Sequence, residues 1–118
     1  MFIRQHFSAY LGKVTTVEID SGVLIAAKNH FGFCPEEEPL IESVKYDAFD
    51  FIWSQSANSY DMVFFDVNYE EGEVKVSPPI KYFQPDFLAK LVDITTQEGG
   101  LVAINTIIED GANRNVVV

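Results

Sequence analysis

The stretch Tyr60-Asp-Met-Val-Phe-Phe-Asp66 decides the fold class. Its nearly continuous apolar run is typical of a strand that is covered on both faces, as in a parallel sheet between layers of helices. Asp66 stands where this strand would end. The sequence therefore predicts a buried strand with a carboxylate at its mouth.

Strand patterns and helix patterns alternate on both sides of this run. We predict strands over residues 14–19, 40–46, 60–65 and 101–107. Between them we predict a helix over residues 21–30, capped by Ser21 and closed by Gly32, a helix opened by Asp47, and a helix over residues 83–94. The apolar faces of these helices are expected at Leu24, Ala27 and Phe31, at Phe49, Ile52 and Trp53, and at Phe87, Leu88, Leu91 and Val92. This alternation predicts an α/β fold with mostly parallel strands and flanking helices.

Length and composition fit one small folded domain over residues 1–118. The chain has 47% hydrophobic and 22% charged residues, which is ordinary for a globular protein. No apolar run approaches the ~20 residues of a membrane-spanning helix. The first residues lack the pattern of a signal peptide, and the single cysteine, Cys34, cannot form an internal disulfide. We therefore expect an intracellular, cytoplasmic protein without a membrane span.

The charge balance narrows the range of partners. Eight Lys and Arg residues against 18 Asp and Glu residues give a net charge of −10, which repels the phosphate backbone of nucleic acids. The same charge could attract a basic partner, such as a polyamine or a Lys-rich protein segment, or could serve solubility alone. His6 and His30 form no metal-ligand pattern, and we expect no metal site.

Carboxylates follow three of the predicted strands, at Glu18 and Asp20, at Asp47 and at Asp66. Parallel α/β sheets bind ligands outside the carboxyl ends of their strands, and an acidic residue there commonly accepts hydrogen bonds from a ribose diol. Simpler roles compete with this one. Glu18 could be a solvated residue at a strand end, and Asp47 could be a helix N-cap.

The order and spacing of several motifs carry a family resemblance. They are Thr-Val-Glu-Ile-Asp at residues 16–20, Phe-Gly-Phe at 31–33, Tyr-Asp-Ala-Phe-Asp-Phe-Ile at 46–52 and Tyr-Asp-Met-Val-Phe-Phe-Asp-Val at 60–67. Together they resemble class I S-adenosylmethionine-dependent methyltransferases, within these the spermidine-synthase-like branch, and there a domain that methylates the N-terminus of a protein. The resemblance runs from about residue 2 to residue 110.

The resemblance implies a role for each matching residue. Glu18 would bind the ribose hydroxyls of S-adenosylmethionine, and Ile19 would pack on its adenine. Asp47 would accept a hydrogen bond from the adenine amino group, and Ala48 would supply a backbone N–H. Asp66 would lie beside the methyl donor, where a carboxylate can orient an amine and take up its proton.

The chain departs from the family pattern in two places, one that bears on the substrate and one that bears on the cofactor. Polyamine synthases carry a second Asp where this chain has Asn68, which argues against putrescine as the substrate. No Gly-rich loop precedes residue 14. We therefore expect a truncated, partial Rossmann-like methyltransferase sheet that lacks its first, central strand and its terminal strands. Such a sheet exposes apolar edges, so we also expect the chain to form a homo-oligomer.

Three functions remain open at this point. The first is methyl transfer from S-adenosylmethionine to an amine of a basic protein substrate. The second is a non-catalytic, truncated methyltransferase-like protein that acts by association. The third is a spermidine-synthase-like aminopropyltransferase. The sequence leaves open whether the chain is an active enzyme.

Overall fold

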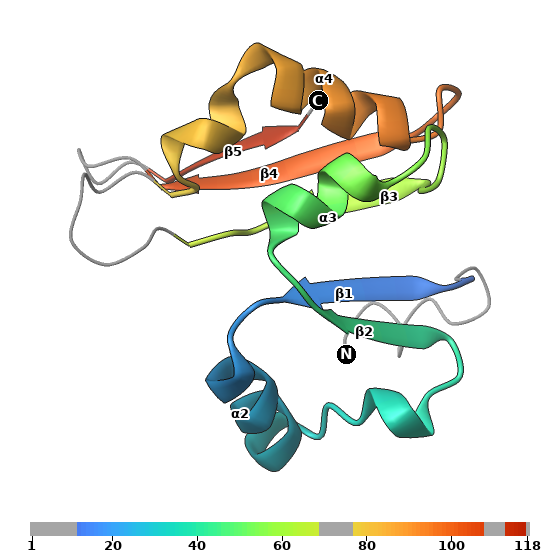
Figure 1. The fold of residues 1–118 in the computed structure, drawn as a ribbon, viewed down its shortest axis with the longest axis vertical. Coiled ribbons are helices and arrows are strands. Elements are labelled where there is room, and N and C mark those ends of the chain that lie inside the picture. The colour runs from blue at the N-terminus through green and yellow to red at the C-terminus, as the bar shows by residue number, and fades with distance from the viewer. Residues whose placement is uncertain (1–11, 69–76, 108–112, 118) are drawn as a thin grey trace. The chain divides into compact units, whose positions relative to one another are not determined.

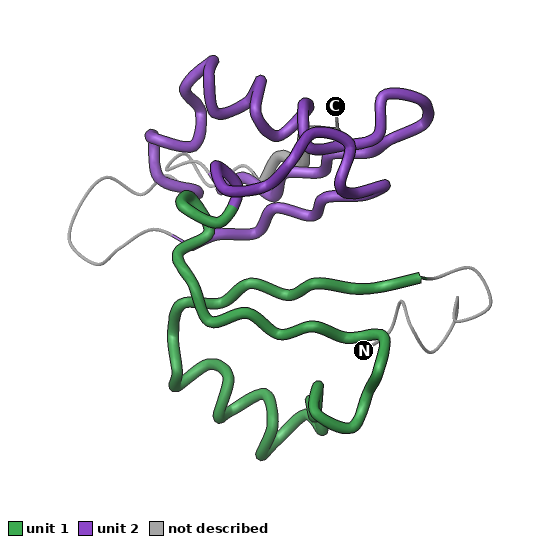
Figure 2. The backbone as a smooth tube through the Cα atoms, turned by 45° about the vertical axis from the view of Figure 1, so that its right-hand side comes forward, with its two compact units in different colours: residues 1–51 green, residues 52–118 purple. Residues whose placement is uncertain are grey.

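The computed structural model describes residues 12–68, 77–107 and 113–117 (Figure 1). The chain divides into two compact units, residues 1–51 and residues 52–118, and each unit is described by itself below (Figure 2). The elements are β1 (Val14–Glu18), α2 (Ser21–Phe31), η1 (Pro35–Glu37), β2 (Ile41–Lys45), α3 (Ala48–Ser54), β3 (Met62–Phe65), η2 (Ile80–Phe83), α4 (Pro85–Ile94), β4 (Leu101–Ile107) and β5 (Asn113–Val117). The α/β class and the four predicted strands are confirmed.

In the first unit, β1 and β2 pair in parallel and α2 lies between them in sequence. The register runs from Val14 opposite Ile41 to Glu18 opposite Lys45. The N-cap of α2 is Asp20, whose side chain accepts a hydrogen bond from the Gly22 N–H at 2.6 Å. The prediction that Ser21 caps this helix is therefore wrong, because the carboxylate one residue earlier already satisfies the free N–H. Gly32 ends α2 in the left-handed conformation, at φ 66°, as predicted.

The first unit has no fully buried side chain among its described residues, 12–51. Leu24 and Ala27 of α2 are half-buried, as one expects for the face that packs on two strands. Phe31, predicted on the same face, is 82% exposed. A two-stranded sheet is too small to cover the full length of a helix, so the last turn of α2 extends into solvent.

In the second unit, β3 pairs in parallel with β4, and α4 covers one face of the sheet. Phe87, Leu91 and Ile94 of α4 are at most 1% exposed. The Phe87 ring lies 5.7 Å from the Phe65 ring and 5.2 Å from the Tyr82 ring, measured between centroids. These aromatic contacts form the centre of the core.

Helix α4, predicted over residues 83–94, differs from the prediction in its first residue and in its buried face. It begins at Pro85 rather than Phe83, because a proline at the first helical position disfavours helical geometry in the residue before it. Residues Ile80–Phe83 form the short 3-10 helix η2 instead. Val92, predicted on the apolar face, is 47% exposed, and Ile94 fills the core position at the helix end.

Within the described residues of the second unit, β3 is covered on one face only, contrary to our prediction. Its Phe65 is 5% exposed, whereas Met62 and Phe64 are 56% and 61% exposed. Alternate residues of a strand point to opposite faces, and among the described residues of the second unit only the α4 face has a covering layer. Trp53 of α3, also predicted to be buried, is 42% exposed, although its ring lies edge-on to that of Phe87.

A further strand, β5, lies after the last of the four predicted strands. It pairs antiparallel with β4, from Ala103 opposite Val117 to Ile107 opposite Asn113. The expectation that all terminal strands are missing is therefore wrong. Pairing with the free edge of β4 satisfies backbone N–H and C=O groups whatever the side chains are, so a polar sequence can form this strand.

The strands form two sheets, of order β1-β2 and β3-β4-β5. Within the described residues no strand pairs with the second edge of β1 or of β3. In the described residues, β1 pairs with β2 and β3 with β4 in parallel, and β4 pairs with β5 antiparallel, in agreement with mostly parallel strands.

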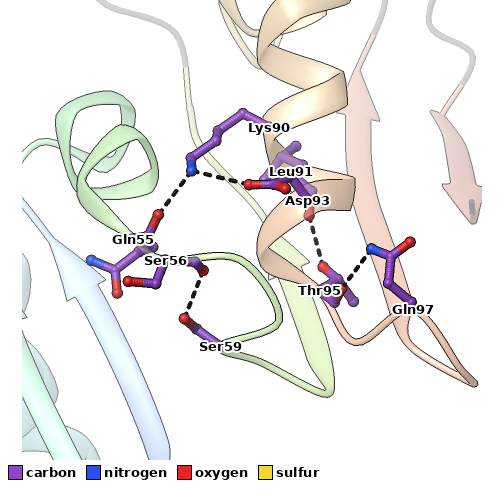
Figure 3. A network of polar contacts seen from close by, with 8 residues as sticks. All are labelled: Gln55, Ser56, Ser59, Lys90, Leu91, Asp93, Thr95 and Gln97. Atoms are coloured by element: carbon purple, nitrogen blue, oxygen red, sulfur yellow. Dashed lines mark hydrogen bonds and ion pairs between the residues drawn. The ribbon is translucent and has the colours of Figure 1, made fainter.

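Polar contacts fix the turn that leads into β3 (Figure 3). The Lys90 ammonium of α4 donates to the Gln55 carbonyl at 2.8 Å and lies 3.2 Å from the Asp93 carboxylate. The Ser59 N–H donates to the Ile94 carbonyl at 2.8 Å. The start of β3 is therefore held against the end of α4.

In the described ranges, no helix combines the length and the apolar character needed to cross a bilayer.

Candidate functional site

Glu18 is the last residue of β1, and its carboxylate turns toward the backbone that follows. Its Oε1 atom accepts a hydrogen bond from the Asp20 N–H at 2.8 Å. Among the described residues, no hydrogen bond reaches its second oxygen, Oε2. Ile19, the next residue, is 59% exposed. The end of β1 thus presents one carboxylate oxygen and one apolar side chain to solvent.

Asp47 lies two residues beyond β2 and caps α3. Its Oδ1 atom accepts hydrogen bonds from the Phe49 N–H at 2.7 Å and the Asp50 N–H at 3.4 Å. The N-cap role that the sequence allows for Asp47 is therefore confirmed. Ala48 follows as the first residue of α3.

The structure brings four of the predicted site residues to one edge of the first unit. The Tyr46 N–H, one residue before Asp47, donates to the Glu18 carbonyl at 3.2 Å. The ends of β1 and β2 therefore lie side by side, since the two strands are parallel. Residues 18 and 19 lie at the end of β1, and residues 47 and 48 lie just beyond the end of β2.

Asp66 lies in the second unit, one residue beyond β3. Its side chain is exposed, and its Oδ1 atom accepts a hydrogen bond from the Asn105 side-chain amide at 3.0 Å. Phe65 is opposite Ile104 in the parallel register, so Asp66 and Asn105 are the next pair along the two strands. Asn105 is not among the residues predicted from the sequence. The available signal was an amide residue that interrupts the apolar run of β4 near its carboxyl end.

Val67 and Ser77 lie on either side of residues 69–76 and are joined by a hydrogen bond. The Ser77 hydroxyl donates to the Val67 carbonyl at 2.9 Å. Ser77 also exchanges two backbone hydrogen bonds with Ile107 of β4, at 2.9 and 2.8 Å. From the sequence we also predict a loop over residues 68–79, of which residues 69–76 lie outside the described residues.

The side chains of the candidate residues supply carboxylate oxygens and one amide. Within residues 12–68 and 77–107, no group of three or more His, Cys, Asp and Glu side chains is arranged to hold a metal ion. His6 lies outside the described residues. The available acceptors suit hydroxyl and amine donors.

The chain is similar in sequence to characterised methyltransferases. It is 28% identical over 116 residues to the human eEF1A lysine and N-terminal methyltransferase, and 31% identical over 114 residues to that of Xenopus laevis. These alignments cover 93% of the chain and 16% of each relative. The chain thus spans about one sixth of the length of the curated relatives that it matches.

The fold is similar to that of a solved methyltransferase. The crystal structure of human methyltransferase-like protein 13 in complex with SAH matches with a TM-score of 0.76 and 26% identity. The match covers 92% of this chain and 49% of the solved one. No protein-family model matches the chain. In sequence and in fold, over more than nine tenths of its length, the chain resembles S-adenosylmethionine-dependent methyltransferases.

Proposed function

We propose that the chain binds S-adenosylmethionine and takes part in methyl transfer to an amine of a protein substrate. The observation that carries this proposal is that Glu18 ends β1 and Asp47 lies two residues past its parallel neighbour β2, at the same end of the two strands. Ligands of parallel α/β sheets bind at such ends. The similarity to an SAH-bound methyltransferase and to protein methyltransferases supports the choice of cofactor and of substrate class.

The residues present fit the nucleoside half of this cofactor. The Oε2 atom of Glu18 is available as an acceptor for a ribose hydroxyl, and the exposed Ile19 offers an apolar surface for the adenine ring. Asp47 uses Oδ1 for the helix cap, so its Oδ2 atom would accept a hydrogen bond from the adenine amino group. Ala48 would supply its backbone N–H to the ring.

Asp66 is the residue that we propose to act on the amine. When bound, the cofactor supplies an electrophilic methyl group on a sulfonium. The Oδ2 atom of Asp66 would accept an N–H of the substrate amine and so orient its nitrogen. The same oxygen, or water, would take up the proton that the nitrogen releases when it is methylated. Orientation of this kind supplies much of the rate of a methyl transfer.

Calorimetric titration with S-adenosylmethionine and with S-adenosylhomocysteine tests the cofactor assignment. We expect saturable binding to the chain and its loss in Glu18→Ala. Glu18→Gln keeps one carbonyl oxygen for the Asp20 N–H and separates a lost ribose contact from a loosened turn. Glu42→Gln, on the exposed side of β2, is the matched control. Equal binding by Glu18→Ala, or none by the folded chain, contradicts the proposal.

The substrate class is tested by transfer of a labelled methyl group. The acceptors are a basic peptide with a free amine and the same peptide with every amine acetylated. The proposal expects label on the free peptide alone, and its loss in Asp66→Asn. Asp61→Asn, at the opposite end of β3, is the control. Label on the acetylated peptide, or full transfer by Asp66→Asn, would contradict an amine substrate held by this carboxylate.

We propose in addition that the chain self-associates through its free strand edges. β1 and β3 each pair on one side only within the described residues. Unpaired edges readily pair with another chain. Light scattering at high micromolar concentration should give a mass above that of one chain. A monodisperse monomer would count against this assignment.

A further inference from the structure

The end of the β3–β4 pair holds a second polar side chain that the proposed mechanism does not use. Asn105 of β4 donates its side-chain amide to Asp66 Oδ1 at 3.0 Å. A donated amide hydrogen also fixes the orientation of its own carbonyl oxygen, because the amide group is planar. Asn105 therefore presents Oδ1 beside the carboxylate that it contacts.

Asp66 and Asn105 each keep one oxygen atom that can accept a hydrogen bond from a ligand. Among the described residues, neither Asp66 Oδ2 nor Asn105 Oδ1 has a hydrogen-bond partner. Both side chains are exposed, so a ligand can reach them. An amine or ammonium group has at least two N–H donors, which match one carboxylate oxygen and one amide oxygen. A hydroxyl group, with its single hydrogen, could satisfy only one of the two.

The neighbouring surface is apolar and lies on the same face of the sheet. Val102, Ile104 and Thr106 of β4 are buried, so the alternate residue Asn105 lies on the face opposite α4. Phe64 of β3 precedes Asp66 by two residues, is 61% exposed and is in register with the small Ala103. An exposed ring beside a small residue suits the alkyl part of an amine, and the ring face also attracts a cation.

From this arrangement we infer that Asn105 and Asp66 form a two-point binding site for a primary amine, with Phe64 against its alkyl chain. The inference deepens the proposed function and rests on it, because methyl transfer to an amine is what gives this pair a substrate. Asn105 positions Asp66 through the hydrogen bond and contacts the amine through Oδ1. An N-terminal amine and a lysine side chain share this chemistry.

The test is a titration of the ¹⁵N-labelled chain without cofactor, followed by NMR. Glycylglycinamide represents an N-terminal amine, n-butylamine represents a lysine side chain, and N-acetylglycylglycinamide is the ligand control. We expect the amine ligands to shift the side-chain signals of Asn105, and the acetylated ligand to leave them unchanged. The stronger of the two amine ligands identifies the source.

The variants separate binding from folding. Asn105→Ala removes one of two acceptors and should weaken amine binding about tenfold, which is the usual effect of one lost hydrogen bond to a charged group. Asn105→Gln keeps the amide and should recover part of the affinity. Asp61 accepts a hydrogen bond from the Thr96 hydroxyl at 3.1 Å at the other end of β3, so Asp61→Asn is a matched control and should bind like the wild type.

The two proposals fail separately. Amine binding by Asn105→Ala at wild-type strength, or no shift in the folded wild-type chain, overturns the two-point site whatever the cofactor does. Unchanged titration with S-adenosylhomocysteine in Asn105→Ala, together with lost amine binding, supports it. Amine binding at this pair without any cofactor binding would refute the methyl-transfer function and retain the amine site.

Discussion

The rings of Trp53 and Phe87 meet edge to face, with their centroids 6.4 Å apart and their planes at 69°. Phe87 is 1% exposed and contacts two further rings, so it is the centre of the second unit. Trp53 is the single tryptophan of the chain. Its fluorescence therefore reports on the packing of this core.

Phe87→Ala should destabilise the second unit by about 3–5 kcal/mol, since it removes a buried aromatic side chain and leaves a cavity. Urea titration followed by Trp53 fluorescence measures the effect. Phe64→Ala is the control, because the Phe64 ring is 61% exposed and its loss should cost much less. Equal losses for both variants would mean that Phe87 is not the core residue that we describe.

Gly100 should tolerate no side chain. A Cβ atom at this position would collide with the Thr96 carbonyl oxygen and lie 2.6 Å from Thr95 Cγ2. Gly100→Ala therefore requires the backbone to move, and we expect a loss of about 1–3 kcal/mol or more in the free energy of unfolding.

Gly99→Ala separates this clash from backbone strain. Gly99 has a φ of 76°, and a Cβ atom there meets nothing within 4 Å. Its substitution should cost only the ~1 kcal/mol of a left-handed alanine. The urea midpoints of the two variants give the comparison, and a smaller loss for Gly100→Ala than for Gly99→Ala contradicts the close approach to Thr96.

The hydroxyl group of Thr16 on β1 is buried and has no hydrogen-bond partner among the described residues. Replacing it with a methyl group removes an unsatisfied polar atom and keeps the shape of the side chain. Thr16→Val should therefore raise the free energy of unfolding by about 1 kcal/mol. Thr15→Val is the control on the same strand. Thermal unfolding measured by circular dichroism tests this, and a destabilised Thr16→Val would reveal a partner for the hydroxyl.

The sequence predicts β1, β2, β3 and β4 well because each of these strands has a clear local signal. The β4 strand has the predicted bounds, and Gly32 ends α2 where a glycine is expected. The predictions that depend on the tertiary environment are less accurate. Phe64 has the composition of a buried residue, yet its exposure depends on which faces of β3 have a covering layer. No local pattern in the sequence contains that information.

For the candidate site, the positions of Glu18, Asp47 and Asp66 at strand ends could be predicted from the sequence, because each lies at or just past a local strand pattern. Their binding roles stay predictions. The contact of Asn105 with Asp66 depends on the register of β3 with β4 across 39 positions of sequence, which no local motif encodes. The β5 strand was missed for a related reason, because its pairing uses backbone groups rather than a side-chain pattern.

An exposed ion pair on the first unit should give a small pH dependence of stability. The Lys28 ammonium donates a hydrogen bond to Glu36, which lowers the pKa of that carboxyl below 4.5 and raises the pKa of Lys28 above 10.5. A lowered carboxyl pKa contributes stability above the unfolded value, and that stability disappears as the pH falls through the folded value. The contribution of Lys28 is present below 10.5 and disappears as the pH rises through its folded pKa.

Glu36→Gln should therefore differ from the wild type between these two limits and converge with it in acid below pH 4.5. Because both side chains are exposed, the difference should be small and should shrink in high salt. Thermal unfolding across this pH range measures it, with Glu98→Gln as the control. A difference that grows as the pH falls below 4.5 would contradict the assigned partner.

Asp47 is expected to serve both the helix cap and the cofactor, and two substitutions separate these roles. Asp47→Asn keeps a side-chain oxygen for the Phe49 N–H, so the stability of the chain should change little. Its amide nitrogen would then face the adenine amino group, donor against donor, and we expect S-adenosylhomocysteine to bind about tenfold more weakly. Asp47→Ala should lose the same affinity and in addition about 1 kcal/mol of stability, because the cap is removed.

Calorimetric titration and thermal unfolding of the same samples distinguish the two effects. Asp86→Asn is the control, because Asp86 accepts from the Phe87 N–H in the first turn of α4, in the second unit. Asp47→Asn with wild-type affinity would leave Asp47 as a helix cap alone. Because that variant keeps the cap, a loss of affinity without a loss of stability can arise only if the carboxylate itself contacts the ligand.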